Sequence, residues 1–366
     1  MDKSVLKQKS SFDLVTFFKG VAIILVVLVH SHQKFMLTDT ARLMPRFGQM
    51  GCQIFFLLSA FGLCYSFSKN AVSWFGFLKK RISKIYSGFY WAIIIHIVYR
   101  LLKSEAISLK GIILNGLFLH GLVPNNTINN LTVRGGWFVG TIVILYALFP
   151  LLFKLYNIHN AFWRKIRIIA FPTIIFIFSY ILTSLLGTIN PIFLCHNNSF
   201  MYFSFINQLT PFALGICLYD IIENIGVKKI KGAVILSLIF LALTIKLFYE
   251  RYDFSFKICP TTMAISMMFL FLAAYKCDGF CDSLGKNKNI IIPIIKGFGK
   301  ISFQIYLLHS FIVYDLIEWL IPYLRIIYSS DTLWYIILLP VIYALCFIIG
   351  FVFNKLLNIL KKKKAC

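Results

Sequence analysis

Residues 17–32 read FFKGVAIILVVLVHSH, and this stretch decides the fold class. No charged residue interrupts the nine positions from Val21 to Val29. Together with the apolar residues before it, the stretch reaches the length of about 20 residues that a helix needs to cross about 30 Å of hydrocarbon. No small-residue cleavage site follows it, so it does not resemble a removable signal peptide. We therefore predict a retained transmembrane helix over residues 12–31.

Apolar runs of this length recur along the whole chain. Of the 366 residues, 59% are hydrophobic and only 14% are charged, and this composition excludes a water-soluble globule. We predict an all-α fold, a polytopic membrane helix bundle forming a single domain over 1–366, with a core of about 12–354 and a basic tail at 355–366. The ten predicted spans are 12–31, 47–67, 85–102, 137–157, 166–187, 200–222, 232–250, 258–275, 298–321 and 332–354.

An eleventh apolar run, from Gly111 to Val123, is shorter than the others. It has only 13 residues and contains Asn115 and His120, so we expect a re-entrant or interfacial segment. Loop charge supports this choice. With ten spans and a cytoplasmic N-terminus, 25 of the 37 basic residues lie inside and 11 outside; with eleven spans, 13 lie inside and 23 outside. The positive-inside rule therefore favours ten spans and two cytoplasmic termini.

The formal charge of +24 does not indicate a nucleic-acid partner here. The basic residues lie in short loops between apolar spans, as membrane topology requires. The nine cysteines are scattered, and only Cys277 and Cys281 are close together. We expect no metal site and no disulfide framework.

Two ionisable residues lie within residues 17–31 of the first predicted span. Lys19 and His30 are eleven positions apart, close to three helical turns, so their side chains share one face about 16 Å apart along the axis. An ionisable group at this depth costs about 2.5 kcal/mol or more unless it faces a polar cavity, so both residues are candidates for function. The alternative is that Lys19 reaches back to the cytoplasmic interface and His30 marks the outer one.

The spacing of Lys19 and His30 resembles the first-helix signature of the acyltransferase 3 family of membrane O-acyltransferases. Four further stretches are similar to family motifs in the same order, and the resemblance spans about residues 12–313. They are MGCQIFFLLSAF with Gly51 and Ser59, KKRISKIYSGFYW with Arg81 and Lys84, WFVGTIVILYALFPLL with Trp137 and Tyr146, and ISFQIYLLHSF with Tyr306 and His309. This chain has Thr16 where many relatives have an aspartate, which leaves the role of Asp13 open.

The resemblance implies a donor-binding role for Arg81 and Lys84. They lie three apart on one helical face, where two cations can hold the phosphates of acyl-CoA. The alternative is that Arg81 and Lys84 only contribute to the positive charge of a cytoplasmic segment, a role that requires no ligand. Ser59 is a candidate hydrogen-bond donor to the same ligand, although a serine in a span often bonds its own backbone.

The catalytic candidates are His30 and Lys19. Imidazole titrates near neutral pH, so His30 can act as a general base toward an acceptor hydroxyl or form an acyl intermediate, and both mechanisms stay open. Lys19, deeper toward the cytoplasm, can stabilise the thioester oxyanion or the CoA end of the donor. His309 and Trp137 are candidates for acceptor binding. The alternatives are that His309 has a purely structural role and that Trp137 anchors its helix at the membrane interface.

The resemblance implies transfer of an acyl group, in most relatives acetyl, from cytoplasmic acetyl-CoA or another acyl-CoA to a hydroxyl of a cell-surface glycan or its lipid-linked precursor. The expected location is the bacterial cytoplasmic membrane, and the expected partners are acyl-CoA, the glycan acceptor and membrane lipid. A transporter or flippase without covalent chemistry is one alternative. An acyltransferase that acts on a small molecule is another. The sequence does not decide the acceptor, the acyl chain or the oligomeric state.

Overall fold

A computed structural model describes residues 3–67, 73–123, 133–190, 200–227, 231–277 and 290–363. Within these ranges every regular element is a helix, which confirms the predicted all-α class. Ten segments are long and apolar enough to cross a membrane, and each overlaps one predicted span. They are Ser11–Ser31, Asp39–Phe67, Trp74–Leu102, Trp137–Tyr156, Ala161–Ile189, Met201–Ile225, Ala233–Glu250, Asp253–Lys276, Ser302–Ile327 and Asp331–Lys362.

The chain divides into two compact units. Unit 1 comprises Met1–Cys52, Ser87–Ala92 and Asp282–Cys366, and unit 2 comprises Gln53–Tyr86 and Ile93–Cys281. Unit 1 contains α1 (Lys3–Ser31), α2 (Asp39–Phe47), η1 (Gly48–Met50), α14 (Ile291–Lys300), α15 (Ser302–Ser310), η7 (Phe311–Leu316), α16 (Ile317–Ile327) and α17 (Asp331–Lys363). Unit 2 contains most of α3 (Gly51–Phe67) and α4 (Trp74–Leu102), with α5 (Leu109–Gly116), η2 (Leu119–Leu122), α7 (Trp137–Tyr156), α8 (Ala161–Ile189), α9 (Phe200–Phe203), α10 (Phe205–Asp220), η5 (Ile221–Ile225), α11 (Ala233–Glu250) and α12 (Asp253–Lys276).

In unit 1, α1 packs against α14, although the two helices are far apart in the sequence. Glycine makes the close approach possible, because a Cβ atom at Gly20 would overlap the backbone of Ile295 and one at Gly299 would overlap the carbonyl oxygen of Thr16. The carboxylate of Asp13 accepts a hydrogen bond from Lys296 at 2.7 Å across the same pair of helices. The structure thus assigns Asp13 an ion pair with α14.

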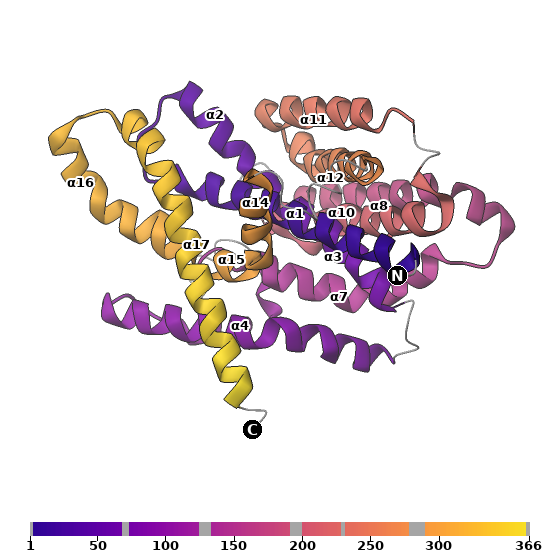
Figure 1. Cartoon of the computed structure of the whole chain (residues 1–366), viewed down its shortest axis with the longest axis horizontal. Helices are drawn as coiled ribbons and strands as arrows, with labels where there is room; N and C mark the ends of the chain where they lie inside the picture. Colours follow the sequence, from indigo (N-terminus) through magenta and orange to yellow (C-terminus); the bar gives the residue numbers. More distant parts are fainter. Residues whose placement is uncertain are drawn as a thin grey trace. The chain divides into compact units, whose positions relative to one another are not determined.

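Helix α10 forms the centre of unit 2. All of its residues except Phe205 and Tyr219 are buried, and it packs against α7, α8 and α12. Gly215 lets α10 approach α3, since a Cβ atom there would overlap the carbonyl oxygen of Leu57. Helices α11 and α12 lie side by side at the edge of this unit (Figure 1). Unit 2 is therefore a bundle around one nearly inaccessible helix.

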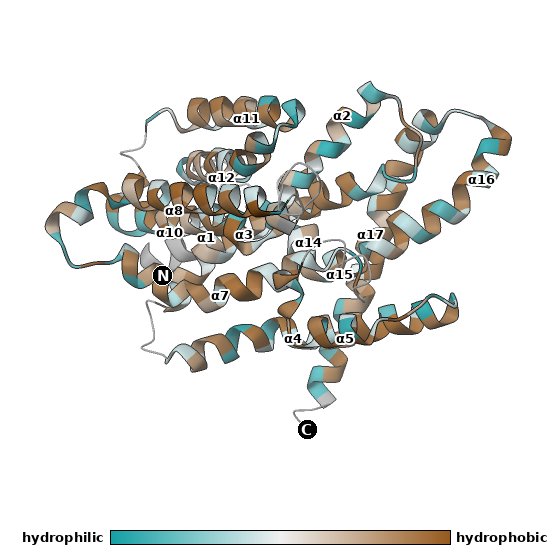
Figure 2. Cartoon of the chain, turned by 180° about the vertical axis from the view of Figure 1, so that it is seen from behind, coloured by the Kyte–Doolittle hydropathy of each residue, from teal (hydrophilic) through white to brown (hydrophobic). Residues whose placement is uncertain are grey.

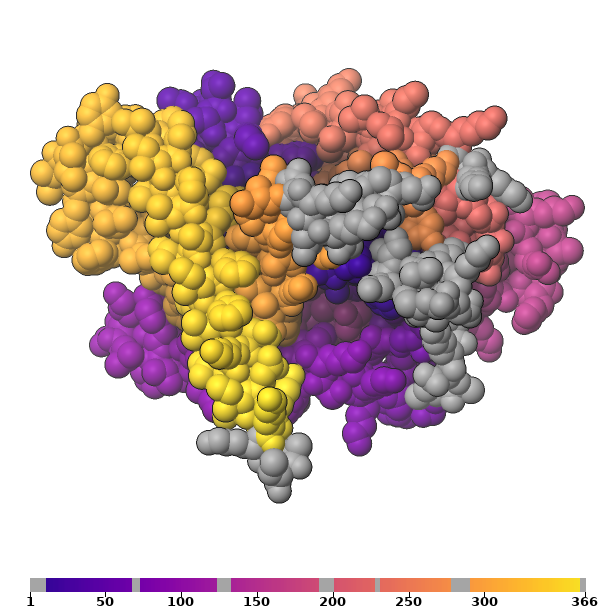
Figure 3. Space-filling view, viewed as in Figure 1, coloured from indigo at the N-terminus to yellow at the C-terminus, as the bar shows by residue number. Residues whose placement is uncertain are grey.

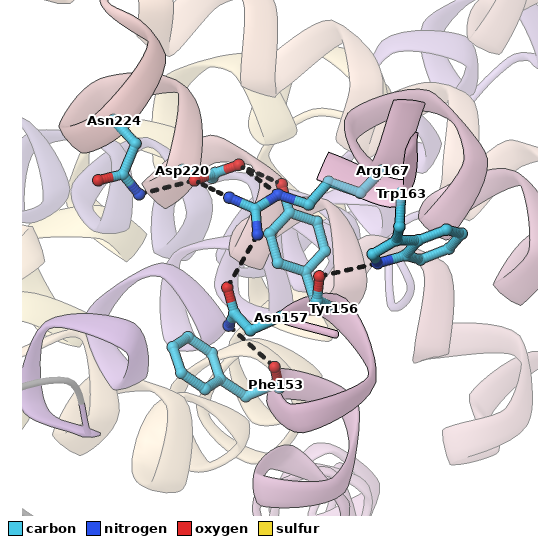
Figure 4. A network of polar contacts seen from close by, with 7 residues as sticks. All are labelled: Phe153, Tyr156, Asn157, Trp163, Arg167, Asp220 and Asn224. Carbon is cyan, nitrogen blue, oxygen red and sulfur yellow. Dashed lines mark hydrogen bonds and ion pairs between the residues drawn. The ribbon is translucent and has the colours of Figure 1, made fainter. Parts of the chain in front are cut away.

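A polar network joins three helix ends in unit 2, the C-terminal ends of α7 and α10 and the N-terminal part of α8 (Figure 4). Asp220, at the end of α10, is 2% exposed and accepts hydrogen bonds from Tyr156 at 2.7 Å and Asn224 at 2.7 Å. Arg167 of α8 completes the network and also donates to Asn157 at 3.1 Å. All four acceptor positions of the buried carboxylate are therefore used, as burial of a charge requires.

The outward faces of several helices carry large apolar side chains, as lipid contact requires. Figure 2 shows hydrophobic colouring along most of α7, α8 and α11. Helix α17, yellow in Figure 3, lies on the surface and exposes apolar residues along its length. These exposed side chains include Ile177 and Ile181 of α8, Ile235 and Leu238 of α11, and Ile336 and Ile348 of α17.

The eleventh apolar run is too short to span, in agreement with its prediction. It forms α5 and η2, and the helix breaks between them at Phe118, which has a positive φ of 59°. A residue with a side chain seldom adopts this conformation, and it stops helix propagation. Gly121 of η2 meets Gly140 of α7 backbone to backbone, so the run packs on the beginning of α7.

Helix α4 begins earlier than the predicted span of 85–102. It starts at Trp74, where the Ser73 hydroxyl caps the helix by accepting from Gly76 at 3.2 Å. The basic residues of this first part are good helix formers, so hydropathy marks where lipid begins but not where the helix begins. Arg81 and Lys84 therefore stand inside a long helix. The predicted single domain stays a prediction.

Candidate active site

His30 and His309 lie side by side in unit 1. His30 is the second-last residue of α1, and His309 is the second-last residue of α15. Their ring centroids are 5.1 Å apart and the ring planes meet at 39°. His30 was predicted to act in catalysis and His309 in acceptor binding, and the structure brings the two residues together.

The backbone fixes the protonation site of His309. Its ring is buried, and Nδ1 lies 2.7 Å from the carbonyl oxygen of Tyr306 and 3.3 Å from that of Ile305. A carbonyl oxygen only accepts, so the proton of the neutral ring is on Nδ1 and the lone pair is on Nε2. His309 therefore presents a basic nitrogen next to His30.

Tyr314 is a third member of this cluster, and the sequence analysis did not identify it. Its hydroxyl lies 2.6 Å from Nδ1 of His30 and donates to Oε1 of Gln33 at 2.7 Å. Tyr314 belongs to η7, a π-helical turn that follows His309 almost directly. Tyr314 is five positions after His309. In a regular α-helix two such residues would point about 140° away from each other, whereas the i to i+5 bonds of a π turn bring residues at this spacing closer to one face. Hydropathy does not reveal such a turn.

Lys19 is half-buried on α1, three helical turns before His30. The rise of an α-helix places the two residues about 16 Å apart along the axis, so Lys19 does not join the histidine cluster. It directly precedes Gly20, where α1 and α14 make their close approach. Its role in oxyanion stabilisation stays a prediction.

Arg81 belongs to a second group of candidate residues, in unit 2. It is partly buried on α4, its Nη2 donates to Ser66 of α3, and its guanidinium lies over the ring of Phe77, 5.5 Å from the centroid. Its Nε atom is buried and has no hydrogen-bond partner among the described residues. Arg81 therefore keeps a donor that the described part of the protein does not use.

Ser59 and Tyr146 belong to the same group. The hydroxyl of Tyr146, on α7, lies within hydrogen-bonding range of Ser59, on α3, and close enough to Arg81 to feel its charge. Ser59 and Arg81 were both predicted to bind the donor, and Tyr146 interacts with both of them. Tyr146 was noted only as part of a motif, because nothing in its own helix reveals its neighbours on α3 and α4.

Lys84 is exposed one turn beyond Arg81 and close to both Arg81 and Lys80. Within the described ranges, none of the three cations Lys80, Arg81 and Lys84 has an acidic partner. Like charges at this spacing repel one another, so no acidic neighbour offsets the cost of holding them together. The arrangement concentrates positive charge at the beginning of α4. Such a cluster favours a polyanionic ligand.

Trp137 is the first residue of α7, and aromatic packing accounts for its position in unit 2. Its ring centroid lies 4.7 Å from that of Phe203 and 6.2 Å from that of Phe56. One turn further along α7, Thr141 donates to the carbonyl oxygen of Phe203 at 2.9 Å. Acceptor binding by Trp137 stays a prediction.

Ten apolar helices, with ionisable residues such as Lys19, His30 and His309 inside the spans, define an integral membrane protein with a polar site. The chain belongs to the acyltransferase family whose model, described as an acyltransferase domain, matches residues 13–351. The resemblance seen in the motifs is thereby confirmed, and the protein is a membrane acyltransferase. No curated protein and no solved structure matches the chain.

Proposed function

We propose that this acyltransferase moves an acetyl group from acetyl-CoA to a hydroxyl of a cell-surface glycan or of its lipid-linked precursor. The observation that carries the proposal is the His30–His309 pair. It provides a basic ring nitrogen, Nε2, within helices whose neighbouring residues are uncharged. Acyl transfer to a hydroxyl needs such a base, because an alcohol attacks a thioester only as its proton is removed.

The reaction balances with one histidine as base. Nε2 of His30 takes the proton of the acceptor hydroxyl while the oxygen attacks the thioester carbonyl carbon. The C–O bond forms, the C–S bond then breaks, and the CoA thiolate leaves and takes up the proton from Nε2. An acyl-histidine route forms and breaks one N–C bond in addition. Lys19, about 16 Å from His30 along the axis of α1, would stabilise the CoA end of the donor.

The cations at the beginning of α4 suit the donor. Acyl-CoA carries a diphosphate and a further phosphate on its ribose, and Arg81 with Lys84 would bind these groups. Ser59 and Tyr146 would add uncharged hydrogen bonds. No metal is required, because the thioester is already activated. His309, in unit 1, and Trp137, in unit 2, stay candidates for acceptor binding.

The loop charges support a location in the bacterial cytoplasmic membrane with both termini in the cytoplasm. In that orientation the N-terminal end of α4 faces the cytoplasm, where acyl-CoA is made. The C-terminal end of α1, which carries His30, faces outward, where surface glycans are assembled. This direction of transfer distinguishes a glycan-modifying enzyme from one that acts on a cytoplasmic small molecule.

Titration of acetyl-CoA against the detergent-purified full chain tests the proposal. We expect saturable binding in the wild type and in His30→Ala, and a loss of affinity of about tenfold or more in Arg81→Ala/Lys84→Ala. The charge-matched control Lys361→Ala/Lys362→Ala, at the end of α17, should bind like the wild type. A folded wild type that binds no acetyl-CoA at millimolar concentration would contradict the proposal.

A further inference from the structure

We propose that Tyr314 and Gln33 form a neutral relay that decides which nitrogen of His30 is the base. The inference rests on the proposed function, because it concerns the same histidine. Tyr314 is a positioning residue in this scheme and acts on the reaction only through His30. Its hydroxyl is 2.6 Å from Nδ1 of His30 and 2.7 Å from Oε1 of Gln33.

The direction of the hydrogen bonds follows from counting protons. The phenol of Tyr314 has one proton, and the carbonyl oxygen of the Gln33 amide can only accept, so the phenol donates to Gln33. The phenol oxygen then faces Nδ1 of His30 with a lone pair, and Nδ1 must carry the ring proton. Nε2 of His30 is left with the lone pair that removes a proton from the acceptor.

The relay does the work that a carboxylate does in many histidine-based sites. A carboxylate holds the ring in one tautomer and stabilises the imidazolium that forms during the reaction. A buried carboxylate is costly inside a membrane. The phenol oxygen of Tyr314 accepts the same Nδ1–H without a formal charge, and Gln33, which is exposed, places the far end of the relay toward water.

The relay controls the tautomer of His30 and not that of His309. Nδ1 of His309 is held by the backbone carbonyl of Tyr306, so the tautomer of that ring does not depend on Tyr314. His30 has no such backbone contact at Nδ1 among the described residues, and its ring contacts the phenol of Tyr314 and the side chain of Gln33 instead. The π turn that holds Tyr314 packs on α1, α15 and α17, which fixes the phenol relative to His30.

Nitrogen-15 NMR of the histidine rings in the detergent-solubilised full chain tests the relay directly. The signals of His30 are assigned by their loss in His30→Gln. We expect a protonated Nδ1 and an unprotonated Nε2 in the wild type. Tyr314→Phe should give a mixture of tautomers. Gln33→Met should shift the population toward a protonated Nε2, because the phenol proton becomes available for Nδ1.

Two variants serve as controls. Gln33→Glu keeps an acceptor for the phenol and should keep the wild-type tautomer. Tyr323→Phe removes an exposed phenol from α16, whose ring lies beside Trp319, and should change nothing. An unchanged His30 tautomer in both Tyr314→Phe and Gln33→Met would overturn the relay.

Kinetics separate this inference from the proposed function. Where turnover is measured, Tyr314→Phe and Gln33→Met should lower kcat by about tenfold or more while acetyl-CoA binding stays unchanged, and Gln33→Glu should restore the rate. Tautomer changes without any acetyl-CoA binding by the wild type would support the relay and contradict the proposed donor. Equal losses in Gln33→Met and Gln33→Glu would count against the relay.

Discussion

Arg167 and Asp220 are joined by two parallel hydrogen bonds, from Nε to Oδ2 at 3.1 Å and from Nη2 to Oδ1 at 2.8 Å. The guanidinium also lies over the ring of Tyr156, 4.6 Å from its centroid. The fork of an arginine matches a carboxylate in this way, and a lysine cannot replace it. The pair ties the N-terminal part of α8 to the C-terminal end of α10.

Removing one member of this pair should destabilise the protein strongly. Arg167→Met leaves the buried carboxylate of Asp220 uncompensated, which costs about 3–5 kcal/mol. We expect a clear fall in the thermal unfolding temperature in detergent. The double variant Arg167→Met/Asp220→Leu should recover most of the loss. Lys246→Met, at an ion pair whose lysine is 74% exposed, is the control and should change the temperature little. An equally stable Arg167→Met would contradict this prediction.

A methyl group at Gly299 should disrupt unit 1. A Cβ atom there would overlap the carbonyl oxygen of Thr16, so Gly299→Ala must push α14 away from α1. We expect a lower unfolding temperature and less monodisperse protein by size exclusion. At Gly62, on α3, no atom lies within 4 Å of the new Cβ, so Gly62→Ala should be neutral or stabilise by about 1 kcal/mol. Equal behaviour of the two variants would show that the close approach does not matter.

Acid should destabilise the protein partly through His120. Burial lowers the pKa of His120 from its ordinary value, and its hydrogen bond to the carbonyl of Gly136 opposes this only in part. The folded protein thus keeps the ring neutral, whereas the unfolded chain takes up a proton below about pH 6.5. The contribution of His120 to folding stability is therefore present above about pH 6.5 and is lost as the pH falls below it.

The measurement is the unfolding temperature at about pH 7.5 and about pH 5.5. His120→Gln keeps a donor for the Gly136 carbonyl but cannot titrate, so its unfolding temperature should fall less than that of the wild type. His159→Gln, at an exposed histidine, should keep the wild-type difference. If His120→Gln lost as much stability as the wild type, other groups would account for the acid sensitivity.

His309→Gln should reduce turnover without reducing donor affinity. The variant removes the ring that lies 5.1 Å from His30 and with it a proposed contact to the acceptor, and misplacing a reactant costs about 10² in rate. Acetyl-CoA binding should be unchanged, because the proposed donor contacts lie on α3, α4 and α7. His159→Gln should turn over like the wild type. Full activity of a folded His309→Gln would reduce His309 to a packing role.

Hydropathy was sufficient to predict the ten spans, because crossing a membrane requires about 20 consecutive apolar residues. The short segment from Gly111 to Val123 was also predicted, since its length and its polar residues exclude a span. The pairing of His30 with His309 was not predicted. The two residues are 279 positions apart, and no local pattern carries information on such a contact.

Tyr314, Gln33 and Tyr146 were missed as site residues for a related reason. Tyr314 reaches His30 only because a π turn changes the register of its helix, and the sequence pattern of that turn is not distinctive. Gln33 lies in a short turn whose path follows from the end of α1. The contact of Tyr146 with Ser59 depends on how α7 packs on α3. Side-chain chemistry pointed to His30 as a candidate base, and only packing reveals the groups beside it.

The contact of Gly20 with Ile295 has a consequence for how the chain is made. The two residues are separated by about 275 positions, and ribosomes add about 5–20 residues per second, so α1 enters the membrane about 14–55 s before its partner exists. All of unit 2 is synthesised during this interval. Helix α1, with Lys19 in its apolar stretch, must therefore wait in the bilayer or with an insertion factor until translation reaches α14.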